Sequence, residues 1–145
     1  EKWVTIVPIA LNDVPGPNFI RLTSTEWGGS CSTFDKEVGW NGQPIKQVFT
    51  YRILGTTLDQ GVEQLGLPPP SYIKIDVDGS EKAIIENMDR VLQDLRLKTI
   101  MMEINADISK GVIEEILDEA GFKLRMREQW PGRNVINAQF TREVL

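Results

Sequence analysis

Apolar and polar residues along the chain follow two periods, which predict a mixture of strands and helices. Residues 3–11 are rich in β-branched side chains, residues 18–24 alternate apolar with polar, and residues 47–53 form a third strand-like segment. The Asn-Asp-Val-Pro-Gly-Pro sequence at 12–17 predicts a turn between the first two strands. Residues 26–46 contain glycine and serine without a clean period, so we expect a long loop or insertion there.

Helical spacing of apolar residues predicts two amphipathic helices in the second half of the chain. Asp78 and Glu81 have the spacing of a capping box, which indicates a helix start. The apolar residues that follow recur on one face of this helix: Ile84, Ile85, Met88, Val91, Leu92 and Leu95. A second helix covers residues 112–120 and is closed by Gly121. A shorter helix begins with a capping box at Thr57.

Four further strands are predicted, at residues 72–77, 98–104, 122–127 and 135–141. From residue 57 onward the expected order is helix, strand, helix, strand, helix, strand, strand. This alternation is typical of an α/β fold with a mostly parallel sheet flanked by helices. The last two strands are joined by a Pro-Gly turn too short for a crossover helix, so we expect an antiparallel hairpin.

The length and charge of the chain narrow the classes of protein to which it could belong. Its 145 residues are typical of one compact domain, so 1–145 is treated as a single domain. The 16 basic and 21 acidic residues give a net charge of −5, and no nucleic-acid partner is expected. The apolar runs are far shorter than the ~20 residues that span a bilayer, so no membrane partner is expected either.

Two features of the composition limit the available chemistry. Histidine is absent, which excludes a histidine general base, a Ser-His-Asp triad and histidine metal ligands. Acid–base chemistry would then use carboxylates, lysine, tyrosine or the one cysteine, Cys31. A single thiol precludes an intramolecular disulfide and fits a reducing compartment, so a cytoplasmic location is expected.

Acidic residues stand at the carboxyl ends of two predicted neighbouring strands. In open α/β sheets this edge is where ligands bind. Asp76 ends the apolar strand at 72–77, where an unpaired carboxylate would be costly, so we expect a functional role for it. Glu103 ends the next strand and could face the same crevice. Asp78 and Glu81 are better explained as capping groups of the following helix.

The sequence lacks the usual glycine-rich backbone cradle for a nucleotide. Neither Gly-x-Gly-x-x-Gly nor Gly-x-x-x-x-Gly-Lys occurs in it. The chain also opens directly into a predicted strand, without an initiator methionine or the pattern of a signal peptide. We therefore expect these residues to be a fragment of a longer domain.

Three motifs along the chain carry a family resemblance. They are Thr-Leu-Asp at 57–59, Tyr-Ile-Lys-Ile-Asp-Val-Asp-Gly-Ser-Glu at 72–81 and Met-Met-Glu-Ile at 101–104. Together they resemble the C-terminal part of FkbM-family S-adenosylmethionine-dependent methyltransferases. Val-Pro-Ile-Ala-Leu at 7–11 is similar to the family's third strand. Asp78 departs from the pattern, because the family usually has glutamate there.

The resemblance implies a Rossmann-like class I methyltransferase fold that is truncated at its N-terminus. It also implies methyl transfer from S-adenosylmethionine to an oxygen of a small metabolite or sugar. It implies that Ala10 and Leu11 lie near the adenine and that Asp76 lies near the methyl donor and acceptor. Asp76 would orient the acceptor or act as base, Glu103 would support it, and Glu81 would hold the helix start. We expect this chain alone to bind the cofactor weakly or not at all.

Two other functions remain open at this stage. The Asp-Val-Asp-Gly-Ser sequence at 76–80 also resembles the signature of haloacid-dehalogenase-type phosphohydrolases, with Asp76 as nucleophile, Asp78 as acid or base, and Mg²⁺. Against this, that signature normally lies on the first strand of its domain. The chain could instead be a non-catalytic fragment that acts through contacts, with sheet edges that favour self-association.

Overall fold

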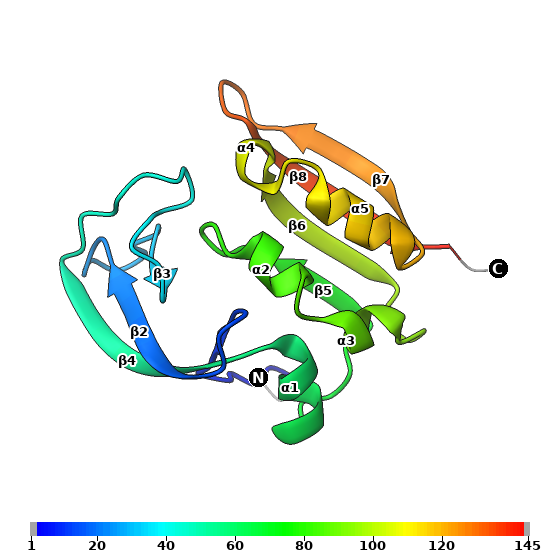
Figure 1. The fold of residues 1–145 in the computed structure, drawn as a ribbon, viewed down its shortest axis with the longest axis horizontal. Helices are drawn as coiled ribbons and strands as arrows, with labels where there is room; N and C mark the ends of the chain where they lie inside the picture. The colour runs from blue at the N-terminus through cyan, green and yellow to red at the C-terminus, as the bar shows by residue number, and fades with distance from the viewer. Residues whose placement is uncertain (1–2, 144–145) are drawn as a thin grey trace.

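The computed structural model describes residues 3–143, which form two four-stranded sheets and five helices (Figure 1). The first sheet, in the order β1-β4-β2-β3, contains β1 (Ala10–Leu11), β2 (Gly16–Leu22), β3 (Thr33–Phe34) and β4 (Phe49–Thr56). The second sheet, in the order β5-β6-β8-β7, contains β5 (Tyr72–Ile75), β6 (Thr99–Asn105), β7 (Phe122–Gln129) and β8 (Val135–Arg142). The helices are α1 (Leu58–Gln64), α2 (Glu81–Ile85), α3 (Asp89–Gln93), α4 (Ala106–Ser109) and α5 (Val112–Glu119). None of them is long and apolar enough to cross a membrane.

Both sheets are mixed, so the expectation of a mostly parallel sheet is wrong. Among the strands of residues 3–143, the pairs β1–β4 and β5–β6 are parallel, and the remaining pairs are antiparallel. In the second sheet, the physical reason is the position of the last strand. A helical crossover leads from β6 to β7, but β8 returns between them and pairs with both. The predicted antiparallel hairpin of β7 and β8 is confirmed.

The first predicted strand is mostly absent. Of residues 3–11, only Ala10 and Leu11 pair, with Gly55 and Thr56 of β4. Trp3 remains 92% exposed and Ile6 86% exposed. Strand propensity describes how well a side chain fits a half-buried pleated surface, and residues 3–9 have no such surface.

The long helix expected after Asp78 is two short helices. α2 ends at Ile85 and α3 begins at Asp89, with Met88 as its N-cap residue. The amide of Asn87 donates to the carbonyl of Ala83 (2.9 Å), which helps to close α2. The predicted apolar face is still buried as far as Leu92, whereas Leu95 is 72% exposed.

The predicted caps have different outcomes. The hydroxyl of Thr57 accepts from the backbone N–H of Gln60 (3.2 Å), so this cap is confirmed. Gly121 follows α5 with φ +83°, as its capping role requires. Asp78 does not cap α2, because Ser80 is the N-cap residue and makes no side-chain cap bond.

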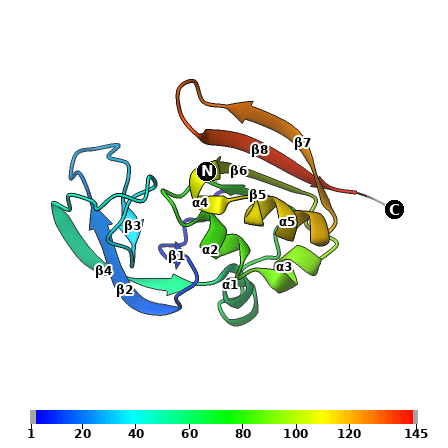
Figure 2. The same cartoon turned by 45° about the horizontal axis from the view of Figure 1, so that its top comes forward.

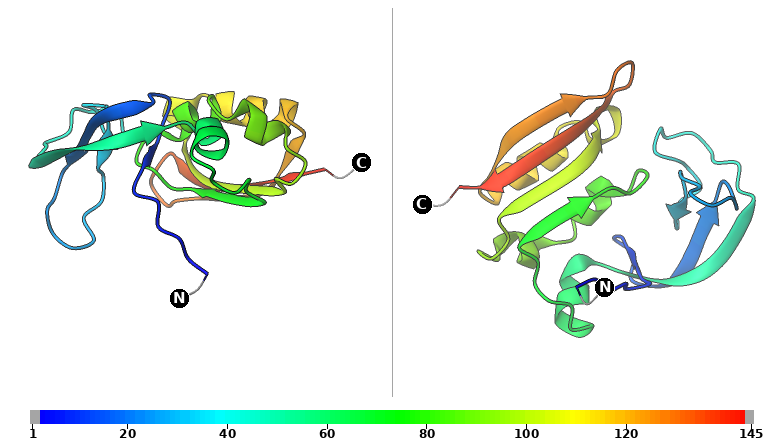
Figure 3. Two further views of the ribbon diagram at one scale, coloured as in Figure 1. Left: turned by 90° about the horizontal axis from the view of Figure 1, so that it is seen from below. Right: turned by 180° about the vertical axis from the view of Figure 1, so that it is seen from behind.

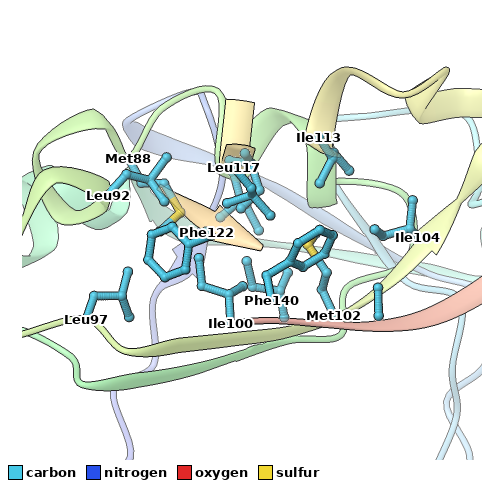
Figure 4. Packing of buried hydrophobic residues seen from close by; sticks show 14 of the residues in the cluster. Met88, Leu92, Leu97, Ile100, Met102, Ile104, Ile113, Leu117, Phe122 and Phe140 are labelled. Carbon is cyan, nitrogen blue, oxygen red and sulfur yellow. The ribbon is translucent and has the colours of Figure 1, made fainter. Parts of the chain in front are cut away.

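The hydrophobic core lies between the helices α2, α3 and α5 and one face of the second sheet (Figures 2 and 3). Figure 4 shows the side chains that meet there from β6, β8, the helices and the start of β7. The fully buried members include Ile85, Met88, Leu97, Ile100, Met102, Ile104, Ile113, Leu117 and Phe122. Alternate residues of β6 point away from this core. Glu103 is one of them, so it lies on the face that α2–α5 leave open.

Candidate functional site

Carboxylates gather where β5 and β6 end. These two strands are adjacent and parallel, so Asp76, just after β5, and Glu103, near the end of β6, reach the same edge of the sheet. Burial raises the pKa of Glu103, and the charges of Asp76 and Asp78 raise it further. Arg133 and Lys74 partly oppose this rise. The structure therefore brings together the acids that stand at the two strand ends.

Asp76 is more exposed than its position after an apolar strand suggested. Its side chain is 59% exposed, and Oδ2 forms an ion pair with Nζ of Lys74 at 2.6 Å. Lys74 alternates with the buried Ile75, so it points to the open face of the sheet, as Glu103 does. The desolvation cost expected for Asp76 is avoided by water and by this lysine.

Glu81 lies at the start of α2 with a strongly shifted pKa. Burial raises the pKa of Glu81 to about 7, with smaller contributions from the charges of Glu103 and Asp78. Hydrogen bonds to the backbone oppose this shift, including one that Oε1 accepts from the N–H of Gly79 (3.3 Å). Near neutral pH this carboxyl therefore exchanges between its charged and neutral forms.

Asp78 binds a distant part of the chain. Its Oδ2 accepts a hydrogen bond from the backbone N–H of Cys31 at 2.7 Å. Cys31 has φ +64°, which is uncommon for a residue other than glycine. Asp78 thus holds an unusual backbone conformation in the segment between β2 and β4. We name this segment, residues 23–48, the long loop, although it includes the two-residue strand β3.

The neighbouring Gly79 is a second contact point for the long loop. Nζ of Lys36 donates to its carbonyl at 3.4 Å. A Cβ atom at Gly79 would lie 3.0 Å from Cα of Trp40, and φ at this glycine is +96°. The carbonyl of Trp40 in turn accepts from the Asn105 amide at the end of β6 (2.9 Å). The long loop is therefore bound to both strand ends.

A cavity of about 430 Å³ lies beside this edge. Part of its lining is apolar and includes Ala10 and Leu11, and another part comes from the turn between Asp76 and Ser80. The remaining lining comes from Ile9, Ile20, Ser32, Thr33 and Phe34. Among the candidate site residues, Ala10, Leu11 and Asp76 line the cavity, whereas Glu81 and Glu103 lie beyond its lining.

Sequence reasoning missed several residues of this edge. Lys36 and Trp40 belong to a segment without periodicity, and nothing in the local sequence indicates that they reach Gly79. In the sequence, Lys74 is marked only by its alternation with the apolar residues of its strand, which predicts an outward-pointing side chain. Asn105 had a usable signal, because it directly follows the apolar run of β6 as Asp76 follows that of β5.

The α/β architecture and the carboxylate-lined strand edge agree with an enzyme of the methyltransferase class. Residues 4–124 match the family model described as the methyltransferase FkbM domain. The chain therefore belongs to the FkbM methyltransferase family, as its motifs indicated. No curated protein and no solved structure matches the chain. Neither the phosphohydrolase alternative nor the non-catalytic one gains support from these comparisons.

Proposed function

We propose that the methyl group donated in this reaction comes from S-adenosylmethionine and is transferred to an oxygen of a small metabolite or sugar. Membership of the methyltransferase family supports methyl transfer in general. The observation that carries the proposal is the cavity lined by apolar residues and by the Asp76–Ser80 turn, at the carboxyl edge of a parallel strand pair. The same arrangement supports a Rossmann-like fold.

The lining of the cavity fits the chemistry of this cofactor. Ala10 and Leu11 offer apolar surface to an adenine, and the carboxylates of Asp76 and Asp78 offer negative charge to a sulfonium. When bound, the cofactor supplies the electrophilic methyl group. The tasks left to the protein are to align the acceptor and to assist the loss of its proton.

Asp76 is the proposed residue for these tasks. Its Oδ2 is engaged by Lys74, which leaves Oδ1 able to accept a hydrogen bond from an acceptor hydroxyl. Removal of that proton by Oδ1 would generate the nucleophilic oxygen. Glu103 supports Asp76 by adding negative charge, and Glu81 holds the turn through its bond to the Gly79 N–H.

Transfer of a labelled methyl group tests the roles proposed for the acids. In the natural protein, Asp76→Asn should lower turnover by ~10²–10⁴-fold, the usual contribution of a general base, without a comparable loss of thermal stability. Glu103→Gln should lower it less. Glu86→Gln is the matched control, because Glu86 pairs with Lys82 on α2 and does not line the cavity. Near-normal turnover of Asp76→Asn would remove this residue from the mechanism.

A further inference from the structure

A second cavity, of about 390 Å³, lies against the first sheet. It is lined by Arg21, Glu37, Val38, Pro44, Ile45 and Gln47, and it shares no lining residue with the candidate site. Ile20 lines the first cavity and Arg21 the second. Ile20 and Arg21 are consecutive residues of β2, so their side chains point to opposite faces of the strand.

The guanidinium of Arg21 is poorly satisfied within the protein. The side chain is only 17% exposed, and Nη1 is buried without a hydrogen-bond acceptor among residues 3–143. A buried donor that makes no hydrogen bond is costly, and more so when it belongs to a charged group. This unmade hydrogen bond contributes unfavourably to the stability of the folded protein.

Glu37 is a weak partner for this arginine. Its Oε1 lies 3.6 Å from Nη2, which is longer than a hydrogen bond, and the Glu37 side chain is 84% exposed. Exposed ion pairs of this kind contribute little stability, so a competing anion could displace Glu37 at small cost.

The opposite wall of the cavity is a small hairpin that bends back at Gly39–Gln43. It is closed by the Val38–Pro44 bridge, by the bond from the Ile45 N–H to the Glu37 carbonyl (3.0 Å), and by that from Gly39 to Gln43 (2.8 Å). Val38, Pro44 and Ile45 give the cavity apolar walls, which strengthen a charge–charge interaction inside it.

We propose that this cavity is a binding site for an oxyanion, namely the carboxylate or phosphate group of a small molecule, with Arg21 as its principal ligand. The planar guanidinium can donate two parallel hydrogen bonds to either group. The bound anion takes the place of the Glu37 carboxylate. The same hairpin carries Trp40, which packs on Gly79, so an anion bound here also braces the long loop beside the candidate site.

Anion-dependent thermal stability of the chain tests this site. Sodium phosphate and sodium acetate are titrated separately at constant ionic strength, with chloride as the balancing anion. Phosphate, acetate or both should raise Tm in a saturable manner. The anion that raises Tm shows whether the site prefers a phosphate or a carboxylate group. Arg21→Gln should weaken the apparent affinity at least about tenfold, because a charge-assisted hydrogen bond is lost.

Two variants make the test decisive. Arg52→Gln is the matched control, because Arg52 lies on the adjacent strand of the same sheet, over the ring of Phe19, and should leave the anion response unchanged. Glu37→Gln should tighten anion binding severalfold, because it removes the competing carboxylate. This variant tests the proposal even if Arg21→Gln does not fold. No response to either anion, an equal loss in Arg52→Gln, or unchanged affinity in Glu37→Gln would overturn the proposal.

Discussion

The acids at the edge of β5 and β6 have different surroundings and hence different properties. Asp76 lies in water beside Lys74, Asp78 binds the backbone of Cys31, and Glu81 is buried enough to titrate near neutral pH. Their types and spacing in the sequence do not distinguish these roles. Because the surroundings decide what each carboxylate does, each residue makes a separate prediction.

Glu81 should make the stability of the protein depend on pH. In the unfolded chain its pKa returns to 4.5, and in the folded protein it is about 7, so between these values the folded state binds more protons. The free energy of unfolding should therefore fall as pH rises through this window. One pKa unit corresponds to ~1.4 kcal/mol, so the contribution of Glu81 is at most about 3.5 kcal/mol.

Chemical denaturation across this pH window measures the effect of Glu81. Glu81→Gln keeps an oxygen that can accept from the Gly79 N–H, and it should remove the part of the pH dependence due to this carboxyl. Glu86→Gln, at the C-cap position of the same helix, should keep the wild-type profile. Parallel profiles for the wild type and Glu81→Gln would contradict the assigned burial of this group.

Asp78→Ala should destabilise the protein by about 1–3 kcal/mol, because it leaves the Cys31 N–H without its charged acceptor. The loss should be accompanied by faster reaction of the Cys31 thiol with a disulfide reagent, as its segment is released. Asp76→Ala is the comparison, since an exposed ion pair is worth less than ~1 kcal/mol. Equal losses of stability in urea titrations would show that Asp78 does not hold the long loop.

At the scale of elements, the segments whose fold depends on their own sequence were predictable. α5 was expected from its apolar spacing and Gly121, and β4 from its strand-forming residues. The strand prediction was wrong for residues 3–9, because a strand also needs a pairing partner, and strand propensity does not reveal whether one is present. The break between α2 and α3 was missed because the apolar pattern continues across it, from Ile85 to Met88.

The turn before α2 should be sensitive to a single methyl group. Gly79→Ala combines a positive φ with a close approach to Trp40, whereas Gly132→Ala has a positive φ and no atom within 4 Å of the added Cβ. Backbone strain costs about 1–3 kcal/mol in both variants, and Gly79→Ala should lose more because Trp40 must move.

Hydrogen exchange distinguishes the two glycine variants. Displacement of Trp40 in Gly79→Ala should speed exchange at the amides of Gly39 and Gly42, which close the hairpin of the long loop. Gly132→Ala should leave these amides protected. Similar stability losses with unchanged exchange in both variants would contradict the packing of the long loop against this turn.

At the scale of the whole molecule, the candidate site is assembled from segments far apart in the sequence. The carboxylates at the strand ends could be proposed from the sequence, because a strand and the residue after it are contiguous. The contacts of Asp78 with Cys31 and of Asn105 with Trp40 join residues 47 and 65 positions apart, and no local pattern encodes them. The mixed pairing of the second sheet was likewise hidden from sequence reasoning, since the place of β8 depends on its pairing partners rather than on its order in the chain.

Binding of S-adenosylmethionine is the central claim at this scale, and amide chemical shifts in a titration of the chain test it most directly. The expected affinity is weak, so cofactor concentrations up to the millimolar range are used. The account predicts saturable shifts at Ala10, Leu11 and Val77, in both parts of the cavity lining, and weaker binding by Asp76→Asn. Shifts confined to other parts of the protein, or an affinity that Asp76→Asn leaves unchanged, would contradict it.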